Sequence, residues 1–377
     1  MQKIDSLLEE LTGKEFFKGG FERLIPLFSP FQSWLTINKT KIITISGTNG
    51  KGETVYFLEQ FFKNTQLTTA SFSSPHIISV TERMKLNGTE ISESLLLENL
   101  MKCRDEVIEF SLSYYELLFL CFLKFIKNNK PIDVLILEVG LGGRLDAVNL
   151  LNADISAVTS ISRDHQEILG NGLSKILKEK LGIIRKGQLL FTSLEQEYLR
   201  NIVTSHIQGL SITHKDLFEL QVSNQQTHYK MRNYNLAKAI FKTLSLCSIP
   251  CFEHMAPSKG RGELMTLGSR SFIFVGAHNV DGMRKMTQYM VGSSQDETIA
   301  NKFQKIIISF SKRTDEEIIK CIEILLKSPC LYQKIIVTTF NHYKAVEEVR
   351  VEKIINHFYT KDSANKKRLS FVKKYNK

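Results

Sequence analysis

The sequence has few cysteines, and they form no recognisable pattern. Its six cysteines are scattered over 377 residues, with no CxxC pair and no cysteine–histidine cluster at zinc spacing. We therefore expect neither a zinc site nor a disulfide framework, and the usage indicates a reduced, cytoplasmic protein.

Long apolar runs are also missing. The longest, LLFLCFLKFI at residues 117–126, is interrupted by Lys124 and has about half of the ~20 residues that a membrane helix requires. We expect a buried helix there and no membrane partner. Near the N-terminus, Asp5, Glu9 and Glu10 stand where a signal peptide needs an uninterrupted apolar stretch, so we expect no export signal.

The chain has an excess of positive charge that is mostly spread along the sequence. The net charge is +11 and the sequence pI is about 9.2, but the lysines are spread along the chain apart from a cluster in KKRLSFVKKYNK at the C-terminus. We interpret this cluster as a solvated end, and we expect no nucleic-acid partner.

What is present is a regular alternation of β-rich and helical segments, in two series. The first has strands at 41–46, 68–72, 134–139 and 155–160 and helical stretches at 93–110, 114–129 and 173–186. The second has strands at 272–279, 305–311 and 334–340 and helical stretches at 280–291, 315–327 and 343–358. Such alternation is typical of parallel sheets.

The segment between the two series, residues 248–263, has two prolines, two glycines and no periodicity, which indicates a linker. The predicted fold class is α/β. A P-loop nucleotide-binding domain with a mostly parallel sheet would occupy residues 1–255, and a smaller Rossmann-like α/β domain would occupy residues 256–377.

The stretch KIITISGTNGKGET, residues 41–54, runs from a β-rich segment into a glycine-dense turn with one lysine. Three glycines in GTNGKG allow backbone N–H groups to turn inward around a phosphate, and the helix that begins near Lys51 points its positive end at the same place. We expect Lys51 to meet the terminal phosphates of a nucleotide. Tight turns also need glycine for conformational reasons alone.

Three predicted strand ends carry potential metal ligands, namely Ser74, Glu138 and His165. Ligands of open α/β sheets bind at the carboxyl ends of strands, and this set would suit a divalent metal that bridges nucleotide phosphates. Taken singly, a turn serine and a lone histidine are more often structural. Lys180 lies on a helix among other charges, where spacing alone favours a solvated face.

Several motifs occur together in a characteristic order. They are GTNGKG, SSPH, LEVGLGGRLDA, the Asp164-His165 pair, EKLGIIRKG, GRGE and GAHN. In order and approximate spacing the chain resembles the folylpolyglutamate synthase and dihydrofolate synthase family, part of the ATP-dependent Mur ligase superfamily. The resemblance extends over residues 20 to about 345 and is strongest over 40–190.

The resemblance implies roles for individual residues. Lys51, Lys180 and His165 would have catalytic roles, and Lys180 matches a lysine that the family carbamylates, so that it would become an oxygen ligand for a second metal. The implied Mg²⁺ ligands are Ser74, Glu138 and His165. The implied ATP contacts are Gly47, Thr48, Asn49, Gly50, Lys51, Gly52, Asn235, Arg261, His278 and Asn279. The implied dihydropteroate contacts lie in Ser113–Glu116, including Tyr115 and Glu116, and at Leu145, Asp146 and Ala147.

The implied reaction is ATP-dependent amide formation in folate biosynthesis and one-carbon metabolism. The γ-phosphoryl group would move to a pteroate or folate carboxylate, and the amine of L-glutamate would attack the acyl phosphate. The partners would be dihydropteroate or folate and L-glutamate, and the protein would be a monomer.

Two alternative functions come from different classes of protein. A cell-wall precursor ligase has the same fold, but LEVGLGGRLDA is characteristic of the folate branch. A non-catalytic nucleotide-binding or nucleic-acid-associated protein is suggested by the net charge and by departures from the family pattern. Against it, the presumed metal ligands and Lys51 are all present.

Three departures from the family pattern lie in or beside segments that are expected to contact the nucleotide. Glu53 stands where the family has serine, RNYN occurs where a His-Gln pair usually precedes the asparagine, and Val275 replaces an aspartate. A carboxylate aimed at phosphates would repel them, so we expect Glu53 to turn outward along the first helical turn, where the helix dipole favours it. The alternative is that it faces the metal. In the outward arrangement Glu53→Ser would keep or improve ATP affinity.

Overall fold

The computed structural model describes residues 2–13, 21–129, 131–217, 228–244, 248–252, 255–292, 305–328, 332–340, 345–362 and 364–373. The chain divides into two compact units, Met1–Phe274 and Val275–Lys377.

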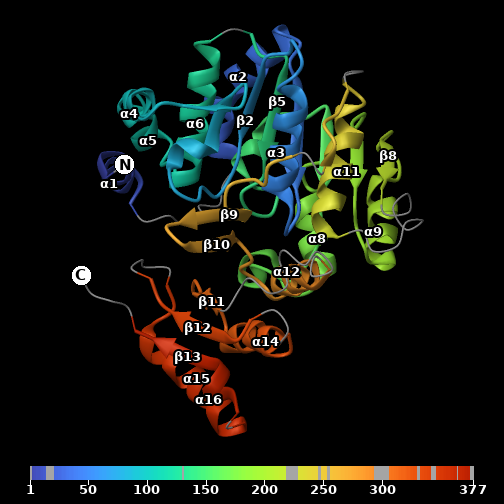
Figure 1. The fold of residues 1–377 in the computed structure, drawn as a ribbon. Helices are drawn as coiled ribbons and strands as arrows, with labels where there is room; N and C mark the ends of the chain where they lie inside the picture. Colours follow the sequence, from blue (N-terminus) through green and yellow to red (C-terminus); the bar gives the residue numbers. More distant parts are fainter. Residues whose placement is uncertain are drawn as a thin grey trace. The chain divides into compact units, whose positions relative to one another are not determined.

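The first unit is built on an eight-stranded sheet in the order β4-β3-β2-β5-β1-β6-β7-β8 (Figure 1). Strands β2, β5, β1, β6, β7 and β8 run parallel, and β3 and β4 add an antiparallel edge. The strands are β1 Lys41–Ser46, β2 Thr69–Phe72, β3 Met84–Leu86, β4 Thr89–Glu90, β5 Val134–Glu138, β6 Ile155–Val158, β7 Leu189–Thr192 and β8 Thr213–Asp216. The predicted mostly parallel sheet is confirmed.

Strand β1 lies in the middle of this sheet with both faces covered. Ile42 belongs to the apolar core on one face, and Ile43 and Ile45 belong to the core on the other. In the neighbouring strand β5, Leu135 and Ile136 are divided in the same way. Because side chains alternate along a strand, a parallel strand covered on both faces reads as a continuous apolar run. This made both strands recognisable in the sequence.

Helices cover the two faces. Helices α1, α2, α4 and α6 contribute to the larger core, whereas α3 and α11 pack against each other over β1, β5 and β6. The helices are α1 Gln2–Thr12, α2 Ile25–Ile37, α3 Lys51–Phe62, α4 Glu93–Met101, α5 Arg104–Glu109, α6 Tyr114–Lys127, α7 Gln166–Leu169, α8 Leu173–Leu181, α9 Glu197–Ile207 and α11 Tyr229–Phe241. Three short 3-10 helices are η1 Glu22–Leu24, η2 Val80–Arg83 and η3 Ala147–Leu150.

Helix α6 contains the longest apolar run, and the expected buried helix is confirmed. Its residues 117–123 are fully buried, and Lys124, which interrupts the run, is paired with Glu106 of α5. Among the described helices, none combines the length and apolar content needed to cross a bilayer.

A two-stranded hairpin follows the linker, with β9 at Arg261–Leu267 and β10 at Arg270–Val275. The sequence predicted residues 272–279 as the first strand of a second parallel sheet, which is wrong: β10 pairs with β9 instead. Tyr56 of α3 donates to Ala256 O over 2.6 Å, and Lys259 pairs with Glu90. These contacts join the segment before the hairpin to the first unit, which ends at residue 274 and not at the predicted boundary of 255.

The second unit has a three-stranded parallel sheet in the order β11-β12-β13. Its strands are β11 Lys305–Ile308, β12 Lys334–Thr338 and β13 Leu369–Val372, and its helices are α12 Val280–Gly292, α14 Asp315–Leu326, α15 Glu348–Lys361 and α16 Asn365–Arg368. Strand β13 comes from the basic C-terminal cluster and buries Leu369 completely. The solvated-end interpretation was therefore wrong for residues 369–372, and residues 374–377 lie outside the described residues.

Candidate active site

The glycine turn between β1 and α3 has the conformation that a phosphate-binding loop needs. Gly47 and Gly50 have φ values of +143° and +94°, and Gly50 is the N-cap of α3. A Cβ on Gly47 would lie 2.0 Å from Thr159 Oγ1, so no side chain fits there. The first four N–H groups of a helix have no intrahelical acceptor. They carry the positive end of the helix dipole, and together these features favour an anion at this turn.

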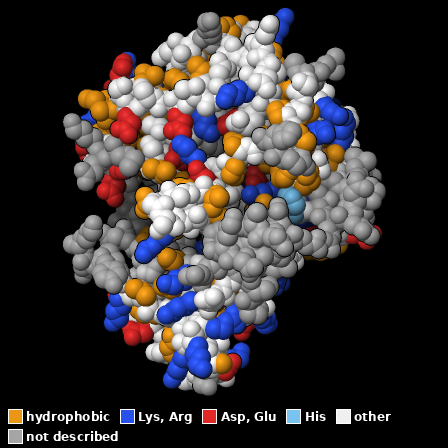
Figure 2. Space-filling view, in the orientation of Figure 1, with side chains coloured by type: hydrophobic (Ala, Val, Ile, Leu, Met, Phe, Trp, Pro, Cys, Tyr) orange, Lys and Arg blue, Asp and Glu red, His pale blue; other side chains and the backbone are white. Residues whose placement is uncertain are grey.

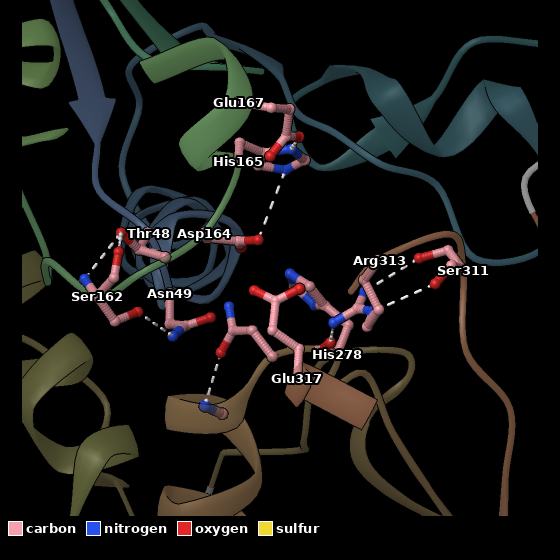
Figure 3. A network of polar contacts seen from close by, with 12 residues as sticks. Thr48, Asn49, Ser162, Asp164, His165, Glu167, His278, Ser311, Arg313 and Glu317 are labelled. Atoms are coloured by element: carbon pink, nitrogen blue, oxygen red, sulfur yellow. Dashed lines mark hydrogen bonds and ion pairs between the residues drawn. The ribbon is translucent and has the colours of Figure 1, made fainter. Parts of the chain in front are cut away.

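Thr48 and Asn49 tie the turn to the segment that follows β6 (Figure 3). Ser162 N donates to Thr48 Oγ1 over 3.1 Å, and Asn49 Nδ2 donates to Ser162 Oγ over 3.2 Å. Thr48 N donates to Ser160 O over 2.7 Å. The side chains of these two predicted ATP contacts therefore hold the loop in shape.

Lys51 folds back over the same turn. Its Nζ donates to Gly47 O over 3.0 Å and to Thr48 O over 3.2 Å. Burial lowers the pKa of Lys51, and the nearby Glu138 carboxyl opposes this effect. The ammonium group is thus held beside the place where the loop would receive phosphates.

Lys180, on α8, reaches the same carbonyl. Its Nζ donates to Gly47 O over 2.9 Å, and the residue is only 4% exposed. The solvated face that spacing favoured is therefore wrong. Burial lowers the pKa of Lys180 to about 7, and repulsion from Lys51 adds to this effect. A substantial fraction of this side chain is then a neutral amine at neutral pH.

Glu138, at the end of β5, lies against the loop that follows β2. Ser74 N donates to Glu138 Oε2 over 3.0 Å, so two of the predicted metal ligands are brought together. Burial raises the pKa of Glu138, and the positive charges of Lys51 and Arg261 oppose the rise. An added cation beside this carboxylate would lower the cost of its charge.

His165 has different surroundings. It is the N-cap of α7 with φ +49°, and its side chain is 50% exposed. Its Nδ1 lies 3.7 Å from Glu167 Oε1 and its Nε2 4.0 Å from Asp164 Oδ1, as Figure 3 shows. Across the described residues, no three His, Cys, Asp or Glu side chains converge on one point that could hold a metal. The three-ligand metal set thus remains a prediction, with Ser74 and Glu138 already adjacent.

Two of the predicted pteroate contacts form a helix cap. Ser113 and Glu116 make a reciprocal capping box at the start of α6. The Glu116 carboxylate also accepts two hydrogen bonds from the Arg23 guanidinium, over 2.7 and 2.8 Å. Their side chains therefore have structural partners.

Tyr115 and Asp146 support the glycine turn after β5. Tyr115 Oη donates to Glu138 O over 3.1 Å and accepts from Gly140 N over 3.1 Å. Asp146 accepts from Leu141 N over 2.9 Å, and burial raises its pKa to about 6. Of the two residues beside Asp146, Leu145 is half-buried and Ala147 is buried.

Helix α11 presents Asn233 to the phosphate loop, and Asn235, the predicted ATP contact, lies two positions further along the helix. A Cβ on Gly50 would lie 2.5 Å from Asn233 Oδ1, whereas Asn235 is half-buried. Residues two apart on a helix point in nearly opposite directions, so they cannot both face the loop. Arg261 does reach it, because a Cβ on Gly52 would lie 2.4 Å from one of its terminal nitrogens.

The expectation that Glu53 turns outward is wrong. It is 5% exposed, and Asn233 Nδ2 donates to its Oε2 over 2.7 Å. Burial raises the pKa of this carboxyl, and Asn233, Lys230 and Arg261 oppose the rise. The side chain therefore points into the protein, toward α11 and the start of β9.

The predicted ATP contacts of the second unit form a local helix start. Asn279 Oδ1 accepts from Gly282 N over 2.8 Å, at the first turn of α12. His278 Nδ1 lies 3.0 Å from Gly276 O, and its own carbonyl accepts from Arg313, which also contacts Ser311 (Figure 3).

Several curated relatives are named dihydrofolate synthase/folylpolyglutamate synthase. No family model matches the chain. Dihydrofolate synthase/folylpolyglutamate synthases are 41% identical over 144 residues in Escherichia coli, 40% over 151 in Buchnera aphidicola of Schizaphis graminum and 37% over 165 in Bacillus subtilis. These matches cover 38 to 42% of this chain, which spans only 34 to 38% of the length of those relatives. They confirm the resemblance seen in the motifs.

Solved structures match almost the whole chain. The Yersinia pestis bifunctional folylpolyglutamate synthase/dihydrofolate synthase with AMPPNP and Mn has a TM-score of 0.74 at 22% identity, covering 99% of this chain and 94% of that one. The Thermotoga maritima folylpolyglutamate synthase has a TM-score of 0.73 at 21% identity, covering 99% and 90%. The chain has the folylpolyglutamate synthase fold.

One residue at the phosphate loop, Asn233, was not predicted from the sequence. Asn233 lies three and four positions before Leu236 and Ala237, which are buried on α11. Helical periodicity therefore places Asn233 on the buried face and Asn235 off it. That signal was in the sequence and could have distinguished the two asparagines.

Proposed function

We propose that this protein is an ATP-dependent ligase that joins L-glutamate to a pteroate or folate carboxylate through an acyl phosphate. One observation carries the proposal: the buried Lys180 and Glu138 and the half-buried Lys51 and Arg261 surround a single glycine turn at a helix start. Charges of both signs, partly or fully withdrawn from solvent beside an anion-binding turn, suit phosphoryl transfer to a carboxylate.

The names of relatives and neighbours give the proposal its substrates. One folylpolyglutamate synthase/dihydrofolate synthase structure contains Mn, AMPPNP and L-glutamate, and an E. coli FolC structure contains DHPP and ADP. By analogy, this chain would bind ATP, a divalent metal, L-glutamate and a pteroate. The chemistry has two steps. First the carboxylate takes the γ-phosphoryl group and releases ADP, which gives the acyl phosphate, and then the glutamate amine displaces phosphate from it.

The protein's own groups would contribute charge and position. Lys51 and Arg261 would stabilise negative charge on the transferring phosphoryl group, and the N–H groups at the start of α3 would fix the phosphates. A bound Mg²⁺ ion would supply further charge neutralisation. Its proposed ligands are Ser74, Glu138 and His165, and hydroxyl and carboxylate oxygens are donors that Mg²⁺ prefers.

Lys180 would act in a modified form. Carbamylation requires a neutral amine, and the burial that lowers the pKa of Lys180 to about 7 supports this form. The carbamate would replace a cation by an anionic oxygen ligand beside Lys51. Residues 113–116 and 145–147 would border the pteroate. A cytoplasmic, monomeric enzyme with no nucleic-acid partner would fit this chemistry.

The test is ligation by the purified full-length protein. ATP, Mg²⁺ and radiolabelled L-glutamate are offered with dihydropteroate and with tetrahydrofolate in parallel reactions. We expect ATP-dependent incorporation with at least one acceptor, and its identity would separate a dihydrofolate synthase from a folylpolyglutamate synthase. Incorporation into neither would favour a non-catalytic nucleotide-binding protein.

A further inference from the structure

A buried carboxylate directly follows the glycine turn. Glu53 is the third residue of α3 and is 5% exposed. Burying a carboxylate is costly unless it is hydrogen-bonded or paired with positive charge. A residue that carries this cost beside a proposed phosphate site requires partners, and all of those described come from distant parts of the first unit.

The first partner is Asn233 of α11. Its Nδ2 donates to Glu53 Oε2 over 2.7 Å, and its Oδ1 lies 2.5 Å from the point where Gly50 would carry a Cβ. One amide group thus touches both the carboxylate and the glycine turn. If Glu53 were shortened, this amide would lose its acceptor in a buried place.

The other partners are cations at the start of β9 and on α11. Arg261 and Lys230 both lower the pKa of the Glu53 carboxyl, so their charges lie close enough to stabilise it. Arg261 approaches Gly52, and Lys230 Nζ lies 2.6 Å from the point where Gly262 would carry a Cβ. Glu53 therefore faces the groups that join α11 and β9 to the loop.

We propose that Glu53 is a positioning residue that holds Asn233 and Arg261 against the glycine turn and thereby sets the affinity for ATP. This inference rests on the proposed function and deepens it. It reverses the expectation from the sequence, because Glu53→Ser should weaken ATP binding and not improve it.

The competing effect is repulsion between the carboxylate and the phosphates. The geometry decides between the two effects, because the carboxylate is directed to Asn233 while Lys51 and the N–H groups of α3 lie at the turn itself. The charges of Lys230 and Arg261 also favour the ionised carboxylate of Glu53 and oppose the rise of its pKa on burial.

The experiment compares Glu53→Gln and Glu53→Ala with a matched control on the same helix. Glu59 is equally buried on α3, but its carboxylate accepts from Ser71 Oγ over 2.5 Å and pairs with Lys85 over 2.9 Å, on β2 and β3. Glu59→Gln removes a buried charge of the same kind with different partners. For each full-length variant we would measure AMPPNP affinity by calorimetry in Mg²⁺ buffer, thermal unfolding, and the KM values for ATP and glutamate.

We expect Glu53→Ala to weaken AMPPNP binding at least about tenfold and Glu53→Gln about threefold or more, since glutamine can still accept from Asn233. The glutamate KM and the kcat at saturating ATP should change less than about threefold. Glu59→Gln should lower the unfolding temperature while it leaves AMPPNP affinity within twofold of the wild type.

Three results would overturn the inference. AMPPNP affinity within twofold of the wild type in Glu53→Gln and Glu53→Ala would remove Glu53 from the positioning role. An equal loss of affinity in Glu59→Gln would assign the effect to general stability. Because Glu53→Gln keeps the size of the side chain, it decides the question even where Glu53→Ala does not fold. A wild type that binds no AMPPNP would overturn the proposed function, and this inference with it.

Discussion

The glycine turn at residues 47–52 and the turn at residues 164–167 both follow strands of the same parallel sheet, yet their side chains are held differently. Around the first, the half-buried Lys51 and the buried Lys180 share the carbonyl of Gly47. At the second, His165 is half-exposed and faces carboxylates at 3.7 and 4.0 Å. Burial lowers the pKa of both lysines of the first set, whereas the imidazole of the second is half-exposed to solvent.

This difference predicts a gradient of effects. Removing a group that has been desolvated and paired changes both charge and geometry, so substitutions around residues 47–52 should be severe. Exposed ion pairs contribute only about 0–1 kcal/mol, so substitutions around residue 165 should be mild unless the imidazole binds metal.

The largest effect should follow Glu138→Ala. We expect ligation to fall by more than about a thousandfold, because the only strand-end carboxylate beside Ser74 among the described residues is lost. The unfolding temperature should stay unchanged or rise, since burial raises the pKa of this carboxyl and its charge is therefore costly to the fold. Radiolabelled glutamate incorporation and thermal unfolding measure the two effects.

Glu138→Gln is the matched control for this change, because it keeps the acceptor for Ser74 N and removes only the charge. It should be nearly as inactive as the alanine variant. Near-normal turnover in either variant would exclude Glu138 from the metal site.

Lys180→Ala should be next, with ligation reduced about a hundredfold or more. If the lysine acts as a carbamate, small carboxylates such as acetate should partly restore activity by occupying its place. Lys178, on the same helix, offers a control, and Lys178→Ala should keep wild-type turnover. Full activity of Lys180→Ala without added carboxylate would leave Lys180 with the structural role of bonding Gly47 O.

The sequence predicts a structural feature correctly where that feature depends on residues close together in the chain. The bounds of β1 were predicted to the residue, because a strand buried on both faces is a continuous apolar run that ends at a glycine. The turn and the strand-end Ser74 and Glu138 follow from this order of elements, whereas Arg261 was implied only by the resemblance to the family. Helix α6 was recognisable for the same reason.

The failures concern partners that are distant in the sequence. Glu53 sits on a first helical turn, where both an outward and an inward side chain are possible, and its partner Asn233 is 180 residues away. Residues 270–275 have the apolar pattern of a parallel strand, but they pair with β9, at residues 261–267, which begins inside the segment 248–263 that was interpreted as a linker. Local patterns do not specify such pairings.

Arg261→Ala should have an intermediate effect that is specific for one substrate. Because the guanidinium lies against Gly52, we expect the KM for ATP to rise about 10- to 100-fold and the KM for glutamate to change less than about threefold. Steady-state kinetics with each substrate varied in turn measure the ratio. Equal increases for both substrates would contradict the placement of Arg261 at the nucleotide.

Lys180 should also make the free energy of unfolding depend on pH. Its pKa is about 7 in the folded protein against its ordinary value of 10.5, so between these values the unfolded chain binds a proton that the folded chain lacks. Stability therefore rises with pH across this window, by at most about 1.4 kcal/mol per pH unit, and is lost as the pH falls toward 7.

Lys180→Met should remove that slope. Denaturant unfolding of both proteins between pH 7.5 and 9.5, in carbonate-free buffer so that no carbamate forms, gives the difference. Parallel pH profiles would show that Lys180 is charged in the folded state, which would also weaken the case for its carbamylation.

The smallest effect should follow His165→Asn. His165 has φ +49°, a conformation that asparagine adopts more readily than most residues, so the unfolding free energy should change by less than about 0.5 kcal/mol. If the imidazole is a metal ligand, the Mg²⁺ concentration for half-maximal ligation should rise about 3- to 10-fold while turnover at saturating Mg²⁺ stays within about twofold. Glu167→Gln, which removes only the neighbouring carboxylate, should leave both values unchanged. Complete inactivity of His165→Asn at saturating Mg²⁺ would instead place the imidazole in the chemical step, and an unchanged Mg²⁺ requirement would leave Ser74 and Glu138 as the remaining candidates to hold the metal.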